Sequence, residues 1–540
     1  MSAITGLIRL PGRTTGWIDD RMNPIVVKEL RQAVKSRFVV AVLMLMLSIL
    51  MITLTAVLLS QDPRRGFDEN AGAELFLVFQ SILLATCMLF VPLYVGVRLA
   101  AERSTATSDL IYVTTIRPSS IVWGKLLAGM VVTALTFSAC APFMIITYLL
   151  RGIDLPTILF VLGLDVLIVL AATQLAIFVG TMPIGWPVKV FLSLALLGLS
   201  GMGFIGMTVI VGEEILRSGI GSMMDDPEFW TGMLVFVGSW MAAVVLVFVL
   251  SVAMITPATA NRALVPRLYF TLVCVGSFVG FFYLTRNVGG MEPLVAWLVS
   301  VFILLMLAAV ISASERESLG PRMRRGIPRS RLLRVPAFFF YSGAAAGLLW
   351  VQAMLALSFL AVFFAKAYFE GLIVAGGAGS WPRYSYDPFP ESWLTRFVAS
   401  SMWVVGYLLL SVIICRRATK MKNGVIVTGV VGLIIMALVS VVPMIIAYAM
   451  DPDRWDFNVE FWLMLNPFGP LFCNDEDWSG TYGFFASILS VGLFVVMQLV
   501  NLPWYWRQFR GFAPPAADPQ ALKADRTDSD ASAPGVAADG

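Results

Sequence analysis

The stretch Asn23–Arg37, NPIVVKELRQAVKSR, runs directly into FVVAVLMLMLSILMITLTAVLL at positions 38–59. With about 100° of rotation per residue, the apolar side chains of the first stretch share one side of a helix, and Lys28, Arg31 and Lys35 lie on the other. The second stretch carries no charge and is long enough, at about 1.5 Å per residue, to cross a hydrocarbon core of about 30 Å. The sequence therefore predicts an amphipathic connector helix with a cationic face that leads into a first membrane span.

Two residues mark the beginning of this connector helix. Asn23 can accept a hydrogen bond from the first turn through its side-chain oxygen. Pro24 suits the first helical position, where its missing N–H would have no partner in any case.

The composition identifies the solvent in which the rest of the chain folds. Of 540 residues, 59% are hydrophobic and only 13% are charged, with a mean hydropathy of +0.84. No water-soluble domain of this size has such a balance. We expect a multi-pass membrane protein without a cleavable signal peptide, in which the first span directs insertion.

Several kinds of chemistry are disfavoured by the residues that the chain lacks. It has no histidine, which removes histidine triads and histidine metal ligands, and its five cysteines suggest no disulfide framework. The P-loop spacing does not occur, since the Gly124-Lys125 pair is followed by Leu126. We therefore expect no catalytic residue, no metal, no cofactor and no nucleic-acid partner, and we expect that this chain does not bind ATP through a P-loop.

Apolar runs continue along the chain and predict about twelve spans. After the first span they lie at 75–97, 126–149, 157–179, 188–211, 231–254, 268–285, 293–313, 337–367, 396–415, 424–447 and 481–503. The predicted fold is all-α, with two six-helix halves behind the connector helix. The expected parts are a cytoplasmic segment 1–22, the connector helix 23–37, the halves 38–265 and 266–503, and a disordered cytoplasmic tail 504–540.

The distribution of basic residues orients these spans. With the amino terminus inside, most of the 38 Lys and Arg residues fall in predicted cytoplasmic segments. The segments after the second and eighth spans are especially basic, and each opens with Glu-Arg, at Glu102-Arg103 and Glu315-Arg316. We expect a cell-membrane protein with both termini in the cytoplasm.

One ionisable residue, Asp165, falls near the middle of a predicted span, where a charge costs at least about 3 kcal/mol on insertion. It must face protein or water rather than lipid. It could contact a substrate or an ion, or it could bridge helices through hydrogen bonds, with Gln174 or Thr173 as candidate partners. We favour the bridging interpretation.

The cytoplasmic segment 102–125 combines charges with a short apolar run around Leu110 and Ile111. A plain connector would be more polar. The segment therefore suits a contact with another protein, and the alternative is a helix lying along the lipid surface.

Together these residues resemble the integral-membrane permease subunit of exporter-type ATP-binding cassette (ABC) transporters. The family's connector-helix pattern is matched by Asn23, Pro24, Lys28, Glu29 and Arg31. Its pattern after the second span is matched by Glu102, Arg103, Thr107, Leu110, Pro118, Gly124 and Lys125, with Ala106 in place of the usual Gly. The step Asn466-Pro467-Phe468 is similar to the family's outer helical hairpin.

The resemblance implies a coupling segment that docks on a separate cytosolic ABC ATPase subunit. Its candidate partner-binding residues are Glu102, Arg103, Asp109, Leu110, Ile111, Arg117, Pro118 and Lys125. Asn23, Pro24, Lys28, Glu29, Arg31 and Lys35 would form the connector helix on the lipid surface. A second permease chain or a second copy of this chain is a further possible partner.

Two other functions stay open from the residues alone. A secondary transporter would need intramembrane charges, for which Asp165 is the candidate. A lipid-linked transferase would need carboxylates gathered at one membrane face, for which the acidic outer segment 448–480 is the candidate.

The predicted topology can be checked by labelling. In a cysteine-free background, single cysteines at Ser60 and Ser330 should react from opposite sides of the membrane, because the basic segment around Ser330 is expected inside. An impermeant maleimide applied to intact cells should label only the Ser60→Cys variant. Labelling of Ser330→Cys from outside would overturn the orientation.

Overall fold

The computed structural model describes residues 24–60, 71–104, 117–150, 152–182, 185–216, 220–257, 259–288, 290–374, 392–418, 424–450, 464–473, 478 and 480–514. Over these residues the ordered elements are helices and no strand occurs. Twelve of the described helices are long and apolar enough to cross a membrane. The predicted all-α, multi-pass membrane fold is confirmed.

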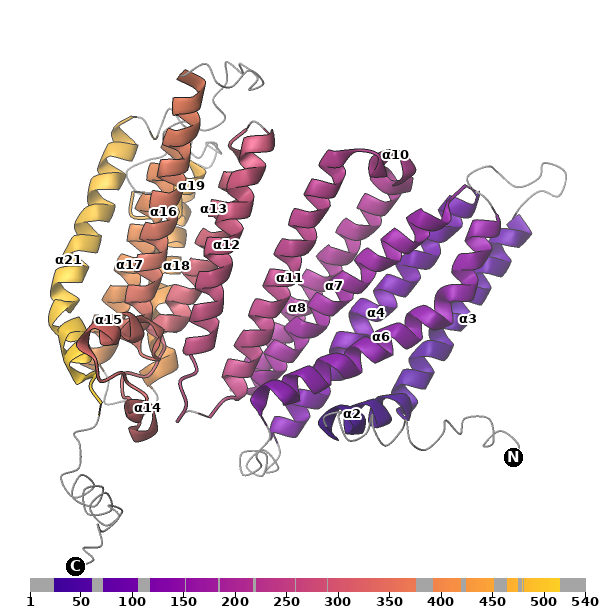
Figure 1. Cartoon of the computed structure of the whole chain (residues 1–540), viewed down its shortest axis with the longest axis horizontal. Helices are drawn as coiled ribbons and strands as arrows, with labels where there is room; N and C mark the ends of the chain where they lie inside the picture. The colour runs from indigo at the N-terminus through magenta and orange to yellow at the C-terminus, as the bar shows by residue number, and fades with distance from the viewer. Residues whose placement is uncertain are drawn as a thin grey trace, which may run out of the picture. The chain divides into compact units, whose positions relative to one another are not determined.

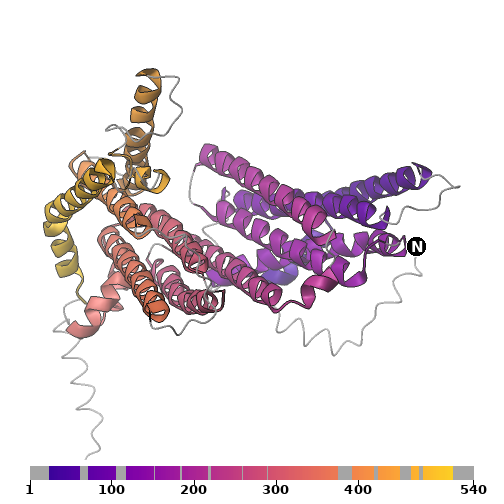
Figure 2. The ribbon, with the colours of Figure 1, turned by 90° about the horizontal axis from the view of Figure 1, so that it is seen from above.

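The chain divides into two compact units, Met1–Pro257 and Ala258–Gly540. Six of the twelve candidate spans lie in each unit. Figure 1 follows them in chain order by colour, and Figure 2 shows the same helices from above.

The first unit is built around one long helix, α4. Its elements are α2 (Pro24–Val34), α3 (Arg37–Ser60), α4 (Ala71–Ser104), α6 (Pro118–Leu149), α7 (Leu155–Thr181), α8 (Trp186–Val209), the π-helical turn Ile210–Ile215, α10 (Ile220–Met224) and α11 (Pro227–Ile255). Helix α4 contacts α3, α6, α7 and α8. Its aromatic side chains Phe76 and Phe79 are fully buried, and Phe79 meets Phe143 of α6 edge to face.

The predicted amphipathic helix is present, but it ends at Val34 rather than at Arg37, where α3 begins. Helix α2 begins at Pro24, packs on α6, and lies across the ends of α3 and α6 in Figure 1. Ala33 is buried, whereas Lys28 and Arg31 are exposed. The two faces of α2 are therefore chemically distinct.

Helices α4, α6 and α7 approach closely through small residues. A Cβ atom on Gly129 of α6 would lie 2.8 Å from Cγ2 of Thr173 on α7, and one on Gly96 of α4 would lie 3.3 Å from Cβ of Ala176 on α7. Small residues let helix backbones come this close where lipid provides no hydrophobic drive between helices. This close contact brings polar side chains of α4 and α7 within hydrogen-bonding reach.

The outward faces of the spans are apolar. In α3, for example, Met44, Leu45 and Ile52 are all more than half exposed. Such a surface would be a large unpartnered apolar patch in water, but it is the expected surface for a helix that meets acyl chains.

The second unit is built around α17. Its elements are α12 (Leu264–Val288), α13 (Glu292–Ala313), α14 (Pro321–Arg325), α15 (Arg331–Phe340), α16 (Ala344–Val374), α17 (Ser392–Ala418), α18 (Gly424–Met450), α19 (Gly469–Phe472) and α21 (Thr481–Gly511). Helix α17 contacts α13, α16, α18, α19 and α21, and its side chains Trp403, Leu408 and Ser411 are buried.

Two predicted span limits are wrong in this unit. The apolar run 337–367 is not one span, because α15 ends at Phe340 and α16 begins at Ala344, beyond a short non-helical link. The last span does not end at 503, since α21 continues to Gly511 and carries Trp504 and Trp506 past the apolar run. The apolar pattern of the sequence does not mark the break between α15 and α16. It also does not mark the aromatic extension at the end of α21.

Candidate functional site

The residue Lys125, in the second turn of α6, forms two ion pairs. Its Nζ lies 2.9 Å from Oε1 of Glu29 on α2 and 2.8 Å from Oε2 of Glu102 near the end of α4. The Lys125 and Glu29 side chains are only 3% and 8% exposed, whereas Glu102 is 39% exposed. We call these three residues the Lys125 cluster, and it ties three helices together at one point.

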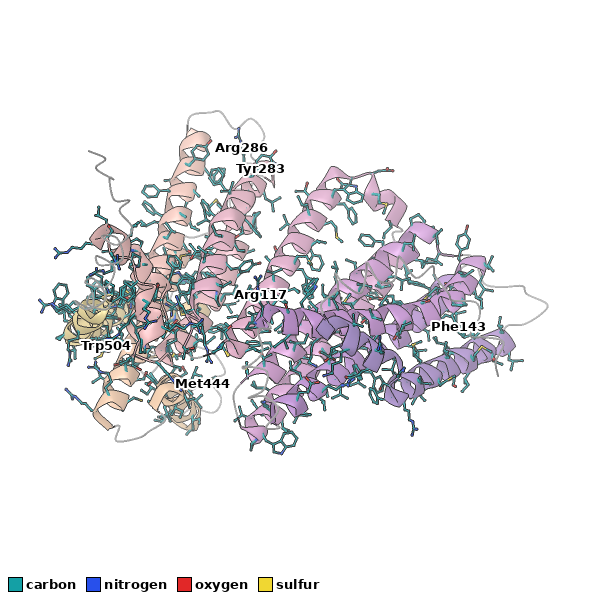
Figure 3. All side chains as sticks on the ribbon, turned by 60° about the horizontal axis from the view of Figure 1, so that its bottom comes forward. Arg117, Phe143, Tyr283, Arg286, Met444 and Trp504 are labelled. Atoms are coloured by element: carbon teal, nitrogen blue, oxygen red, sulfur yellow. The ribbon has the colours of Figure 1, made fainter. Side chains whose placement is uncertain are left out.

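Local sequence explains how each side chain reaches the cluster. Glu29 and Ala33 are one turn apart, so they share the face of α2 that packs on α6. Arg117 has the extended backbone expected before proline, with φ −70° and ψ 136°, and Pro118 begins α6. Lys125 then follows about two turns into the helix. Figure 3 labels Arg117 at this end of α6 and Phe143 toward the other end.

The arrangement is suited to a mechanical role. One ammonium group lies between two carboxylates, and the burial of Lys125 and Glu29 is compensated by these ion pairs. Glu102 and Lys125 lie on either side of segment 105–116 in the sequence. The cluster therefore fixes both sides of that segment to the connector helix.

The structure brings together three of the predicted site residues, Glu29, Glu102 and Lys125. Arg117 is exposed and Pro118 is the first residue of α6. Of the remaining predictions, Lys28, Arg31 and Lys35 lie on or just after the exposed face of α2. Arg103 lies in the last turn of α4, and its side chain is outside the description; Asn23, Asp109, Leu110 and Ile111 lie outside the described residues.

Asp165 bridges two helices, but through a partner that the sequence analysis missed. It is fully buried, and Nε2 of the equally buried Gln80 on α4 donates to its two carboxylate oxygens at 2.9 and 3.2 Å. The candidate partners were wrong: Thr173 donates to a carbonyl of its own helix, and Gln174 donates to Ser251. A glutamine inside an apolar run was the available signal, but the sequence does not contain the register of α4 against α7.

The second unit also contains buried cations, and one of them, Arg267, pairs with a carboxylate. Arg267, at the start of α12, donates to the carbonyls of Phe339 at 2.9 Å and Tyr341 at 2.8 Å, and its Nη2 lies 2.5 Å from Oε1 of Glu315. The other carboxylate oxygen of Glu315, Oε2, accepts a hydrogen bond from the Gly343 N–H at 2.6 Å. Burial raises the pKa of Glu315 although the Arg267 guanidinium opposes the shift. This network, which the sequence analysis missed, holds the link between α15 and α16 against α12 and the end of α13.

No constellation for metal binding is present in the described part of the chain. No group of three or more His, Cys, Asp or Glu residues lies within reach of a common ion there. The five cysteines are free and buried.

The first test concerns the Lys125 cluster. Lys125→Met should lower the free energy of unfolding by about 3 kcal/mol, because it leaves the buried Glu29 carboxylate without a cation. The double variant Lys125→Met/Glu29→Gln removes that charge and should recover much of the loss. Glu102→Gln should cost less than about 1 kcal/mol, since this residue is partly exposed. Thermal unfolding in detergent measures the stability of each variant. Equal losses of stability in Lys125→Met and in Lys125→Met/Glu29→Gln would contradict the prediction.

The second test concerns Asp165. Asp165→Asn should be tolerated better than Asp165→Leu, because an asparagine can still accept from Gln80 Nε2 and can donate to Gln80 Oε1, which has no partner among the described residues. Leucine leaves the buried amide unpaired, at a cost of about 1–3 kcal/mol. Expression level and thermal stability measure the difference. A transport defect in a well-folded Asp165→Asn variant would instead indicate a role for the charge.

Comparison of the chain with protein-family models, with curated proteins and with solved structures gave no match. What the residues of the chain establish is a helical membrane protein with twelve candidate spans, whose connector helix is joined to α4 and α6 by the Lys125 cluster.

Proposed function

We propose that the chain is the membrane-spanning permease subunit of an ABC transporter, which exports a substrate with ATP hydrolysed by a separate cytosolic subunit. One observation carries the proposal. Glu29, Glu102 and Lys125, which belong to two separate parts of the family-like sequence pattern, meet in a single ion cluster. This meeting supports treating the two parts of the pattern as one structural unit, as the proposal requires.

The cluster meets the main physical requirement of such a subunit. A permease driven by another chain needs a cytosolic element whose displacement is passed to the spans. Segment 105–116 joins α4 to α6, and ion pairs tie the neighbouring parts of these helices to α2. A force applied to the segment would act on all three helices together.

The chemistry of the segment suits a protein partner. Leu110 and Ile111 supply apolar anchors between charged residues, which is the usual composition of a small interface. The sequence carries no P-loop, and in this proposal a separate chain supplies the ATPase. In this proposal the segment, the connector helix and both termini are cytoplasmic, and the protein resides in the cell membrane.

A secondary transporter is the second candidate, and Asp165 is the observation in its favour. A buried carboxyl inside a span can bind a coupling proton or cation. The Gln80 hydrogen bonds give Asp165 a sufficient structural role without that function. The permease is therefore the better supported proposal.

The partner prediction is tested by co-purification from native membranes. Replacing Leu110 and Ile111 by Ser should lower the affinity for an ATPase subunit by about thirtyfold, which is the equivalent of about 2 kcal/mol for an interface anchor. Less of the ATPase subunit should therefore co-purify with this variant. Asp109→Asn should have a smaller effect, because a rim charge contributes less than about 1 kcal/mol. Neither variant changes Glu29, Glu102 or Lys125. Both should therefore fold like the wild type, and a lower recovery of the ATPase subunit would report the contact itself.

A photocrosslinker at position 110 gives a second measurement of the same contact. Capture of a nucleotide-binding protein supports the permease. Capture of lipid alone, together with pull-downs that contain no nucleotide-binding protein, would reject it and favour the secondary transporter.

A further inference from the structure

A groove of about 1000 Å³ lies between the connector helix α2 and the span α4. Among the residues that the structure describes, its charged lining residues are Lys28, Arg31, Lys35 and Arg98, and none of the described lining residues is acidic. The nearby carboxylates Glu29 and Glu102 are engaged by Lys125. The groove therefore carries four positive charges that the cluster does not neutralise.

One of these cations is held in place by its neighbours. Arg98 donates to Oε1 of Gln32 at 2.6 Å and to the Tyr94 hydroxyl, and its guanidinium carbon lies 5.1 Å from the centre of the Tyr94 ring. A planar guanidinium fixed in this way is ready to form paired hydrogen bonds to phosphate oxygens. Lys28, Arg31 and Lys35 pair with no carboxylate of the described residues.

The other wall of the groove is apolar. Phe38, Leu93 and Val97 line it and are 42%, 49% and 57% exposed. Phe38 belongs to the first turns of α3 and stacks on the Tyr94 ring with the planes 6° apart. The groove thus has a cationic part beside α2 and an apolar part continuous with the surfaces of two membrane spans.

We propose that this groove binds an anionic phospholipid, with the phosphate of the headgroup at Arg98, Lys28 and Arg31 and an acyl chain along Phe38, Leu93 and Val97. Four cations attract an anion, and the apolar wall distinguishes an amphiphile from free phosphate. Because the site joins α2 to α4, an occupied groove adds a second link between the helices that the Lys125 cluster already connects. Lipid binding in this groove does not require an ATPase partner.

Native mass spectrometry of the full chain in detergent tests the proposal, with phosphatidylglycerol and phosphatidylcholine as the probes. The wild-type chain should bind phosphatidylglycerol more tightly. Arg98→Gln should reduce this affinity by about fivefold, the equivalent of about 1 kcal/mol per basic residue at an anionic surface. Arg286→Gln, an exposed arginine at the end of α12 (Figure 3), removes the same charge elsewhere and should leave the affinity unchanged.

Arg98 contacts two neighbours, so a loss of lipid binding in Arg98→Gln could come from misfolding. A second variant separates these two causes. Lys28→Gln/Arg31→Gln alters only exposed side chains, so it should melt like the wild type and still lose the preference for phosphatidylglycerol. The matched double control is Arg322→Gln/Arg324→Gln in α14, where both side chains are exposed. Equal losses in a groove variant and its control would show diffuse charge attraction and overturn the proposal. So would equal binding of the two lipids, or full displacement of phosphatidylglycerol by millimolar inorganic phosphate.

Discussion

The buried ammonium group of Lys125 is the constraint on which the first unit depends. A charge this deeply buried costs several kcal/mol unless paired carboxylates and hydrogen bonds offset the loss of water. Glu29 and Glu102 provide them from two other helices. The Lys125 charge can be buried only while it is paired. If α2 left α6, Lys125 would lose Glu29, and a buried charge would become exposed or unpaired. A short amphipathic helix, which would be marginal by itself, is thereby fixed to the span bundle.

The second unit meets the same constraint with different residues. Arg267 is buried at the start of α12, and Glu315 together with two backbone carbonyls satisfies its guanidinium. The segment held by this network is the link between α15 and α16, again a short helix followed by a long span. Arginine suits this site because its planar fork reaches several acceptors at once, whereas the lysine of the first unit reaches two carboxylates. Each unit therefore uses one buried cation to attach a short helix to its spans.

The polar groups of the first unit fall into two classes by their partners. Lys125, Glu29, Asp165 and Gln80 are buried and bonded to one another in pairs or clusters, which gives them a sufficient structural role. The basic residues of the groove differ, since they are partly or fully exposed and pair with no carboxylate in the part of the chain that the structure describes. Charges that a fold leaves uncompensated beside an apolar wall are the ones available to a ligand. This contrast separates the residues that hold the bundle together from those proposed to bind lipid.

The sequence by itself determined the fold class, the connector helix and the number of spans. These features depend on local signals: apolar runs long enough to cross a bilayer, a cationic face with helical periodicity, and Pro24 at a helix start. It also pointed to Glu29, Glu102 and Lys125 individually. Only the tertiary structure decided that these three meet, that Asp165 pairs with Gln80 rather than Gln174 or Thr173, and that Arg98 faces α2. The reason is that such pairings depend on the rotation and register of one packed helix against another, and close packing through Gly96, Gly129 and their neighbours sets both.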